Sequence, residues 1–262
     1  EVPTITVGSL MGDDTVTWTQ TFDTKHVDTI KTLIPHGTVV DGNGGFNYLV
    51  TFATVDTGTI TKRYITVSAV ADTKVYDGTT GSDETPIVTS DDGVATGDLA
   101  EWTQSFDNRN VGSGKTLTPT GGIDDDNDGN NYDITFVPVN EGAITQKELT
   151  VTGITASNKT YDGNTTASIN VSGAALSGVV SGDSVTLNTG SAAGAFSTKH
   201  AGTDKTVSIS GLTISGTHAG NYSLTQPTTT ASITKRSLTV TAATDSKSYD
   251  GTTSSSGAPT IT

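Results

Sequence analysis

The sequence contains no cysteine and a single methionine among its 262 residues. Without cysteine the chain cannot carry a disulfide framework, although this is compatible with an extracellular bacterial protein. No run of 18 or more apolar residues is present, so we expect no membrane span. No window shows the 3.6-residue apolar spacing of an amphipathic helix. No signal peptide is visible at Glu1, so we expect a mature piece or an excerpt.

Positive charge is also scarce. Lys and Arg number 14 against 28 Asp and Glu, which gives a formal net charge of −14. Nucleic-acid binding needs clustered Lys and Arg to meet phosphates, so the composition excludes a general nucleic-acid binder. An acidic surface favours solubility and attracts divalent cations.

Recognisable catalytic patterns are missing. The sequence has no Gly-x-Ser-x-Gly elbow, and its histidines at 26, 36, 200 and 218 do not stand at metal-ligand spacing. We therefore predict that the protein is not an enzyme.

A short string is present three times, about 85 residues apart. It reads Lys-x-Tyr-Asp-Gly followed by Thr or Asn. The copies contain Tyr76, Asp77 and Gly78, then Tyr161, Asp162 and Gly163, then Tyr249, Asp250 and Gly251. A chain that repeats one unit of this size is an array of small domains.

Other landmarks recur with the same period and divide the chain. Asp14-x-x-x-Trp18 returns as Asp98-x-x-x-Trp102, and Asn-Tyr pairs stand at Tyr48, Tyr132 and Tyr222. We predict a first module at 1–63 that lacks its opening strand, a second at 64–147 and a third at 148–235. Residues 236–262 would be the opening strand of a further repeat or a donor strand.

Alternating Thr, Ser, Val and Ile, broken by Gly and Asn/Asp-Gly pairs, predict short strands with turns every 8–12 residues. This pattern predicts an all-β fold, with small Ig-like β-sandwich modules in a tandem array that forms an extended rod. β-grasp-like modules are the alternative.

The Tyr-Asp-Gly strings are best interpreted as structural. The Tyr ring would cover one end of the core with its hydroxyl in water. The Asp carboxylate would accept backbone N–H groups in its own turn, and Gly would supply a positive φ. Three copies of one constellation favour fold maintenance over a receptor site, which is usually needed once.

The sequence also offers a candidate calcium loop. Asp124, Asp126 and Asp128 alternate ahead of Gly129, like the first half of a calcium-binding loop. The acid expected eleven residues after the first ligand is replaced by Thr135, and Asp133 could substitute for it. The competing interpretation is a solvated acidic hairpin turn, local to this module.

Trp18 and Trp102 could stack on a sugar, but the third module has Leu187 at that position. Exchange of one large apolar residue for another favours a position in the core.

Three strings in register carry a family resemblance: Lys-x-Tyr-Asp-Gly-Thr-Thr, Gly-Asn-Tyr-x-Leu-Thr and Ala-x-Ile-Thr-Lys-x-x-Leu-Thr-Val. Together they resemble the YDG repeat domain of large bacterial haemagglutinin-type and filamentous adhesins. The resemblance implies a secreted or surface-displayed stalk module, and neither an enzymatic activity nor a named receptor. The first module departs from it, since Phe46 stands where Gly precedes the Asn-Tyr pair.

The ends of the chain are out of phase with the repeat. Either the chain is an excerpt of a longer array, or the C-terminal strand of one copy completes the first module of the next, as in donor-strand fibres. We therefore expect the partners to be neighbouring repeats or identical subunits, at an extracellular or bacterial cell-surface location. The contrasting hypothesis is a module that binds host or cell-surface glycans or a receptor.

Overall fold

The computed structural model describes residues 1–261 and divides into two compact units. The first unit holds Glu1–Lys74 and Thr79–Ile144. The second holds Val75–Gly78 and the described chain from Thr145 onward. Within residues 1–261 the regular elements are strands, apart from one short 3₁₀ turn, η1 (Ala219–Asn221). The prediction of an all-β fold is confirmed.

Strands of the first unit come from the first and second modules, and two of them end in residues that cluster with the second unit. They are β1 (Thr15–Phe22), β2 (Asp28–Val40), β3 (Val55–Ile60), β4 (Arg63–Ser68), β5 (Asp72–Val75), β6 (Ile87–Val88), β7 (Leu99–Phe106), β8 (Gly112–Asp124), β9 (Tyr132–Val137) and β10 (Val139–Thr145).

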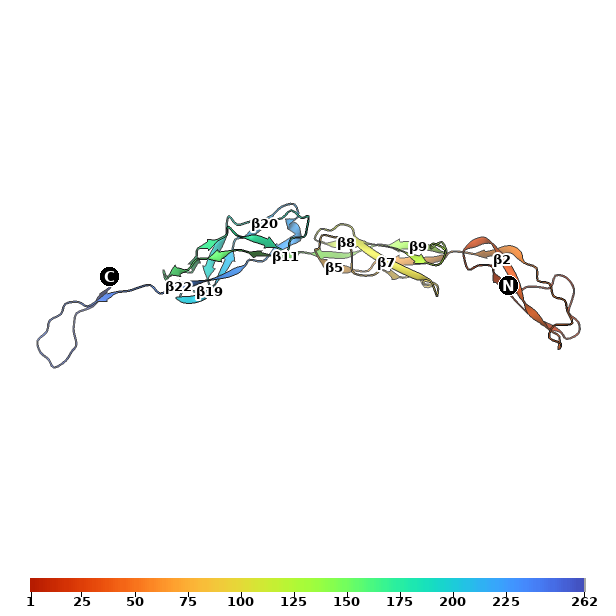
Figure 1. The fold of residues 1–262 in the computed structure, drawn as a ribbon, viewed down its shortest axis with the longest axis horizontal. Coiled ribbons are helices and arrows are strands. Elements are labelled where there is room, and N and C mark those ends of the chain that lie inside the picture. Colours follow the sequence, from red (N-terminus) through yellow and green to blue (C-terminus); the bar gives the residue numbers. More distant parts are fainter. Residues whose placement is uncertain (262) are drawn as a thin grey trace. The chain divides into compact units, whose positions relative to one another are not determined.

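Each module of the first unit is built around one long antiparallel hairpin. β1 pairs with β2, and β7 pairs with β8 in the equivalent register (Figure 1). Each hairpin has a glycine where the two chains come closest. At Gly121, whose φ is +144°, a Cβ atom would lie 2.0 Å from the carbonyl oxygen of Glu101. Only glycine fits this approach, and Gly37 repeats it in the first module.

The second module has two sheets, in the orders β5-β10-β8-β7 and β6-β4-β9. β4 and β9 pair in parallel, from Arg63 opposite Tyr132 to Ser68 opposite Val137. A buried cluster joins residues of the two sheets: Ile65, Val67, Ile123 and Tyr132, with Trp102 packed against it. The core therefore lies between the sheets, as alternating strands dictate.

The second unit contains the third module and the C-terminal segment. Its strands are β11 (Lys147–Thr152), β12 (Thr155–Ala156), β13 (Lys159–Thr160), β14 (Thr166–Ala167), β15 (Ile169–Asn170), β16 (Ala175–Ser177), β17 (Thr186–Asn188), β18 (Ala193–Phe196), β19 (Gly202–Ser210), β20 (Thr213–Ser215), β21 (Tyr222–Leu224), β22 (Thr228–Thr234), β23 (Val240–Thr241) and β24 (Thr260–Ile261).

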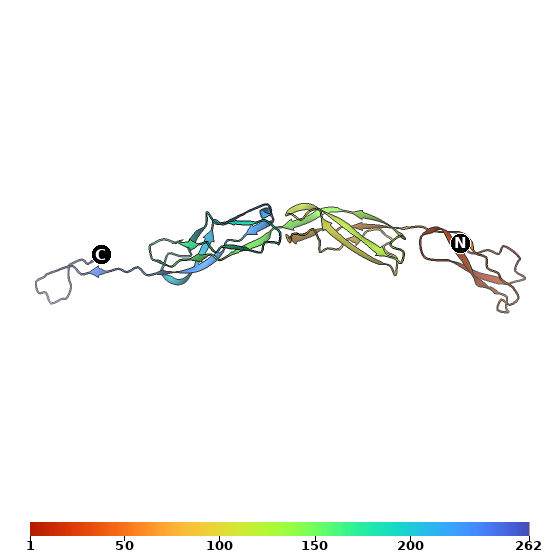
Figure 2. The same cartoon turned by 45° about the horizontal axis from the view of Figure 1, so that its top comes forward.

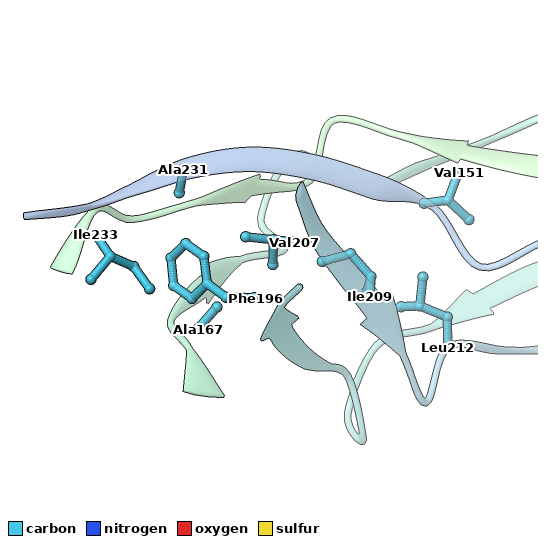
Figure 3. Packing of buried hydrophobic residues seen from close by; sticks show 8 residues of the cluster. All are labelled: Val151, Ala167, Phe196, Val207, Ile209, Leu212, Ala231 and Ile233. Carbon is cyan, nitrogen blue, oxygen red and sulfur yellow. The ribbon is translucent and has the colours of Figure 1, made fainter. Parts of the chain in front are cut away.

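The largest sheet of the second unit has the order β13-β22-β19-β18-β14, and a smaller one has the order β16-β11-β21. β19 and β22 lie side by side in both views (Figures 1 and 2). In the core, the Phe196 ring lies close to Val207 and Ala167, while Leu212 and Ile209 fill the other end near Val151 (Figure 3). These residues belong to one buried apolar cluster of the third module.

Among residues 1–261 no helix is long and apolar enough to cross a membrane, which agrees with the expectation from the sequence.

Candidate functional site at the module ends

The same tyrosine–aspartate hydrogen bond occurs in each module. The tyrosine of every Asn-Tyr pair donates its hydroxyl to the Oδ2 atom of an aspartate at 2.5–2.6 Å: Tyr48 to Asp14, Tyr132 to Asp98 and Tyr222 to Asp183. Each hydroxyl oxygen also accepts one backbone N–H, from Met11, Ala95 or Val180. In the second and third modules the pair ties the loop before one strand to the start of another, β9 or β21, so it closes one end of the module.

This arrangement keeps the tyrosines neutral. Burial, followed by the hydrogen bond to Asp183, raises the pKa of Tyr222 to about 12. The same two causes raise the pKa of Tyr132. A neutral phenol remains a donor to the carboxylate across the physiological pH range.

In the second unit a second tyrosine also donates to the aspartate of this pair. Tyr76, from the first Tyr-Asp-Gly string, is 1% exposed and donates its hydroxyl to Asp183 Oδ2 at 2.7 Å. Its ring packs edge-to-face on Tyr222 with the centroids 5.4 Å apart, and its N–H donates to the Thr145 carbonyl. The Asp183 carboxylate thus accepts two phenols, and its side chain is 0% exposed. The expectation that this tyrosine keeps its hydroxyl in water is wrong for Tyr76, because the carboxylate replaces water as the acceptor.

The turns that follow the tyrosines share one conformation. Gly78, Gly163 and Gly251 have φ values of 83°, 89° and 74°, a region that glycine adopts without a Cβ clash. The Oδ1 atoms of Asp162 and Asp250 accept the N–H two residues further along, at 3.1 and 2.9 Å. The hydrogen bond from Lys159 and the one from the Asn164 N–H hold the pKa of Asp162 below its ordinary value.

The lysine two residues before each tyrosine also belongs to the motif, although sequence reasoning assigned it no role. Its ammonium group donates to a backbone carbonyl beyond the turn, from Lys74 to Thr79, Lys159 to Asn164 and Lys247 to Thr252. Its constant position in the string was the signal that could have identified it.

The turn covers a buried phenylalanine. Lys74 Nζ lies 5.5 Å from the centroid of Phe106, and Lys159 Nζ lies at the same distance from that of Phe196. The N–H groups of these phenylalanines donate to the carbonyls of Thr80 and Thr165, which follow the two turns, and both phenylalanine residues are 3% exposed. Cation–π attraction and apolar burial act together here.

The acidic loop is organised by a residue that was not among the predicted ligands. The Asp125 carboxylate is buried and accepts the N–H groups of Asn127, Gly129 and Asn131. Burial alone would raise the pKa of Asp125, but these three donors together lower it. Asp41 closes the first module's loop with the same three contacts. The sequence suggested that this loop is local to the second module, but the first module has the same arrangement of hydrogen bonds.

The predicted calcium ligands do not gather around one point. Among residues 1–261 the structure shows no group of three His, Cys, Asp or Glu side chains that could hold a metal ion, so Asp124, Asp126, Asp128 and Asp133 form no such cluster. Asp126 instead pairs with Lys25, whose Nζ lies 3.0 Å from its Oδ2. Calcium binding stays a prediction.

Trp102 packs against the core cluster and meets Phe136 edge-to-face, with the centroids 6.0 Å apart. Trp18 meets Phe52 in the same way at 5.6 Å. Each tryptophan thus contacts an aromatic side chain of its own module, and only Trp102 is seen packed against a buried cluster.

The comparisons agree with this repeated geometry. The family model described as YDG domain matches residues 61–140 and again 145–231, together more than half of the chain. The protein therefore belongs to the YDG domain family. Comparison with curated proteins gave no match, and neither did comparison with solved structures.

Proposed function

We propose that this chain is a structural stalk segment of a secreted or surface-displayed bacterial adhesin. In this proposal its modules are small Ig-like sandwiches that form an extended rod. Its task is to set the distance between an anchor and a binding tip, and no catalytic role is assigned to it. Identical chains would also join head to tail by donor-strand addition.

The observation that carries this proposal is the position of Tyr76 and the contacts that its side chain makes. The tyrosine follows β5 in the opening segment of one repeat and ends on Asp183 and Tyr222 of the next. A motif with this position fastens consecutive repeats. A buried charge-assisted hydrogen bond is short and directional, so it also fixes geometry.

A glycan-binding role has weaker support. In the loop around Asp124–Tyr132, which this role would use, Asp125, Asn127 and Asn131 hydrogen-bond to one another, and Trp102 packs against Phe136. The side chains that would recognise a sugar are thus used to hold the module together.

Small-angle X-ray scattering of dilute chain tests the stalk. A compact domain of this length would have a radius of gyration of about 18 Å. A 13-residue strand such as β8 spans about 43 Å, so three modules in line give a radius of gyration of roughly 35 Å. A compact value would overturn the rod. Antibodies raised against the chain should label intact cells of its source bacterium, and labelling only after lysis would exclude surface display.

A further inference from the structure

The third module begins and ends with two segments that lie side by side and run in the same direction. Its opening segment is 147–161 and its closing segment is 222–234. β11 pairs with β21, and β13 pairs with β22, in parallel in both cases. Parallel strands cannot be joined by a tight turn, so the rest of the module forms the connection between the two segments.

The second module has the same arrangement. Its opening segment, 63–76, contains β4 and β5, and its closing segment, 131–145, contains β9 and β10. β4 pairs with β9 in parallel along its whole length, and β5 is the neighbour of β10 in the other sheet. At the far end, the Tyr76 N–H donates to the Thr145 carbonyl at 2.9 Å. The pairing of the opening with the closing segment is therefore a property of the repeat.

Hydrogen bonds join the two segments of the third module from one end to the other. The Thr225 N–H donates to the Leu149 carbonyl at 3.0 Å, and the Tyr161 N–H donates to the Thr234 carbonyl at 2.9 Å. Side chains of the opening segment, or of the residue before it, add further bonds to the closing segment or the residues just before it: Gln146 to Gly220, Thr225 to Glu148 and Ser232 to Asn158. The contact between the segments is thus reinforced along its length.

The chain enters and leaves the third module at opposite ends of these paired segments. At the entry, Lys147 lies opposite Tyr222, which starts the closing segment. At the exit, Thr234 lies opposite Thr160, near the end of the opening segment. In Figure 1, β11 lies at one end of this module and β22 runs toward the other. A pull on the chain at both sides therefore slides one segment along the other. Bonds in a parallel pair are evenly spaced, so they share this load.

We propose that the opening and closing segments of each of these two modules form a clamp that resists tension transmitted by neighbouring repeats. The inference adds a load-bearing function to the proposed stalk and rests on the stalk for the source of the load. Forced unfolding is governed by the rate of unfolding and not by equilibrium stability, so the direction of the pull matters. The β18–β19 hairpin lies within the connection and is loaded only after the clamp yields.

Optical tweezers with DNA handles test the clamp. Because the chain has no cysteine, two introduced cysteines place the handles at chosen residues of the full chain. The end-to-end variant carries Gln146→Cys and Lys235→Cys, so the load slides the segments along each other. The peeling variant carries Gln146→Cys and Thr217→Cys, so the load separates the segments from Lys147 and Tyr222 onward. All three substituted residues are exposed.

At the same constant force, the third module should survive at least about tenfold longer in the end-to-end variant than in the peeling variant, because several hydrogen bonds must break together. The same module is loaded in both cases, and only the direction of the pull differs. An abrupt gain in extension at rupture shows that the module was folded when it was loaded. Equal lifetimes, or longer survival in the peeling variant, would overturn the proposal.

Two matched asparagines locate the clamp. Both Asn158 and Asn188 are exposed, but Asn158 accepts the Ser232 N–H of the closing segment, whereas Asn188 donates to Ser215 within the connection. In the end-to-end variant, Asn158→Ala should shorten the lifetime about threefold or more. Asn188→Ala should change it by less than about twofold. In the peeling variant, Asn158→Ala should have no effect, since its bond lies at the end that separates last. Equal effects of the two substitutions in the end-to-end variant would contradict the clamp.

The scattering experiment is independent of these measurements. A rod whose lifetime under load does not depend on the direction of the pull loses the clamp and keeps the stalk. A compact chain whose lifetime depends on direction as expected loses the stalk and keeps the clamp.

Discussion

Removal of one hydroxyl group tests whether Tyr76 fastens consecutive repeats. Tyr76→Phe keeps the ring against Tyr222 and removes the hydroxyl that donates to Asp183 at 2.7 Å. A hydrogen bond to a charged group contributes about 1.5–3 kcal/mol. Tyr222 still donates to the same Oδ2 atom, so the carboxylate keeps this hydrogen bond. We therefore expect a loss near the lower end, about 1.5–2 kcal/mol.

The assay is thermal unfolding followed by circular dichroism, together with hydrogen exchange at the Val180 amide, which donates to Tyr222. For a unit of this size the expected loss lowers the midpoint by roughly 5–8 °C. Exchange at Val180 should accelerate by about tenfold or more, provided that its opening exposes the pair.

Tyr161→Phe is the matched control. Tyr161 occupies the same place in the next string, and its N–H donates to Thr234 as that of Tyr76 does to Thr145. Its side chain is only partly buried, and the structure gives its hydroxyl no partner among residues 1–261. The substitution should change stability by less than about 0.5 kcal/mol. Equal effects of the two substitutions would refute the fastening role of Tyr76.

Three further outcomes follow from particular contacts. Gly121→Ala should destabilise the first unit by about 2–4 kcal/mol in urea titrations, since its Cβ would clash with backbone, whereas Gly122→Ala, with open space, should cost under about 1 kcal/mol. Asp125→Ala should expose the loop amides to rapid hydrogen exchange, and Asp124→Ala should not. The predicted metal site would be supported by a thermal unfolding midpoint that rises with calcium in the unmodified chain and does not rise in Asp124→Ala. The folded pKa of Tyr222 lies above its unfolded value near 10, so the stability it contributes is complete below pH 10 and is lost between pH 10 and about 12. Tyr222→Phe should flatten this part of the stability profile, and an unchanged profile would contradict it.

Much of the fold was accessible from the sequence because the chain repeats. The alternation of Thr, Ser, Val and Ile predicts short strands, such as β18 and β19, and the Asp-Gly pairs predict the positive φ values of the turns. The repeat period places Phe22 and Phe106 at equivalent positions. It could not show that one ring is buried and the other exposed, because burial depends on which strand lies beside it.

The site was harder to predict, since its groups are distant in sequence. Tyr132 and Asp98 are both repeat landmarks, but their hydrogen bond depends on the parallel pairing of β4 and β9. Composition draws attention to the run of aspartates from Asp124 to Asp128. It does not indicate that Asp125 is the one whose carboxylate accepts the backbone N–H groups of the loop. Asp125 differs from its neighbours only because the folded backbone places three N–H groups around it.

The tyrosine of a Tyr-Asp-Gly string and the aspartate that accepts its hydroxyl therefore belong to consecutive repeats. Within one repeat, Tyr76 and Asp98 look like two separate structural residues; the partner of Tyr76 is Asp183, one period further on. An array built in this way stabilises each module partly through its neighbour, so stability should rise with the number of repeats.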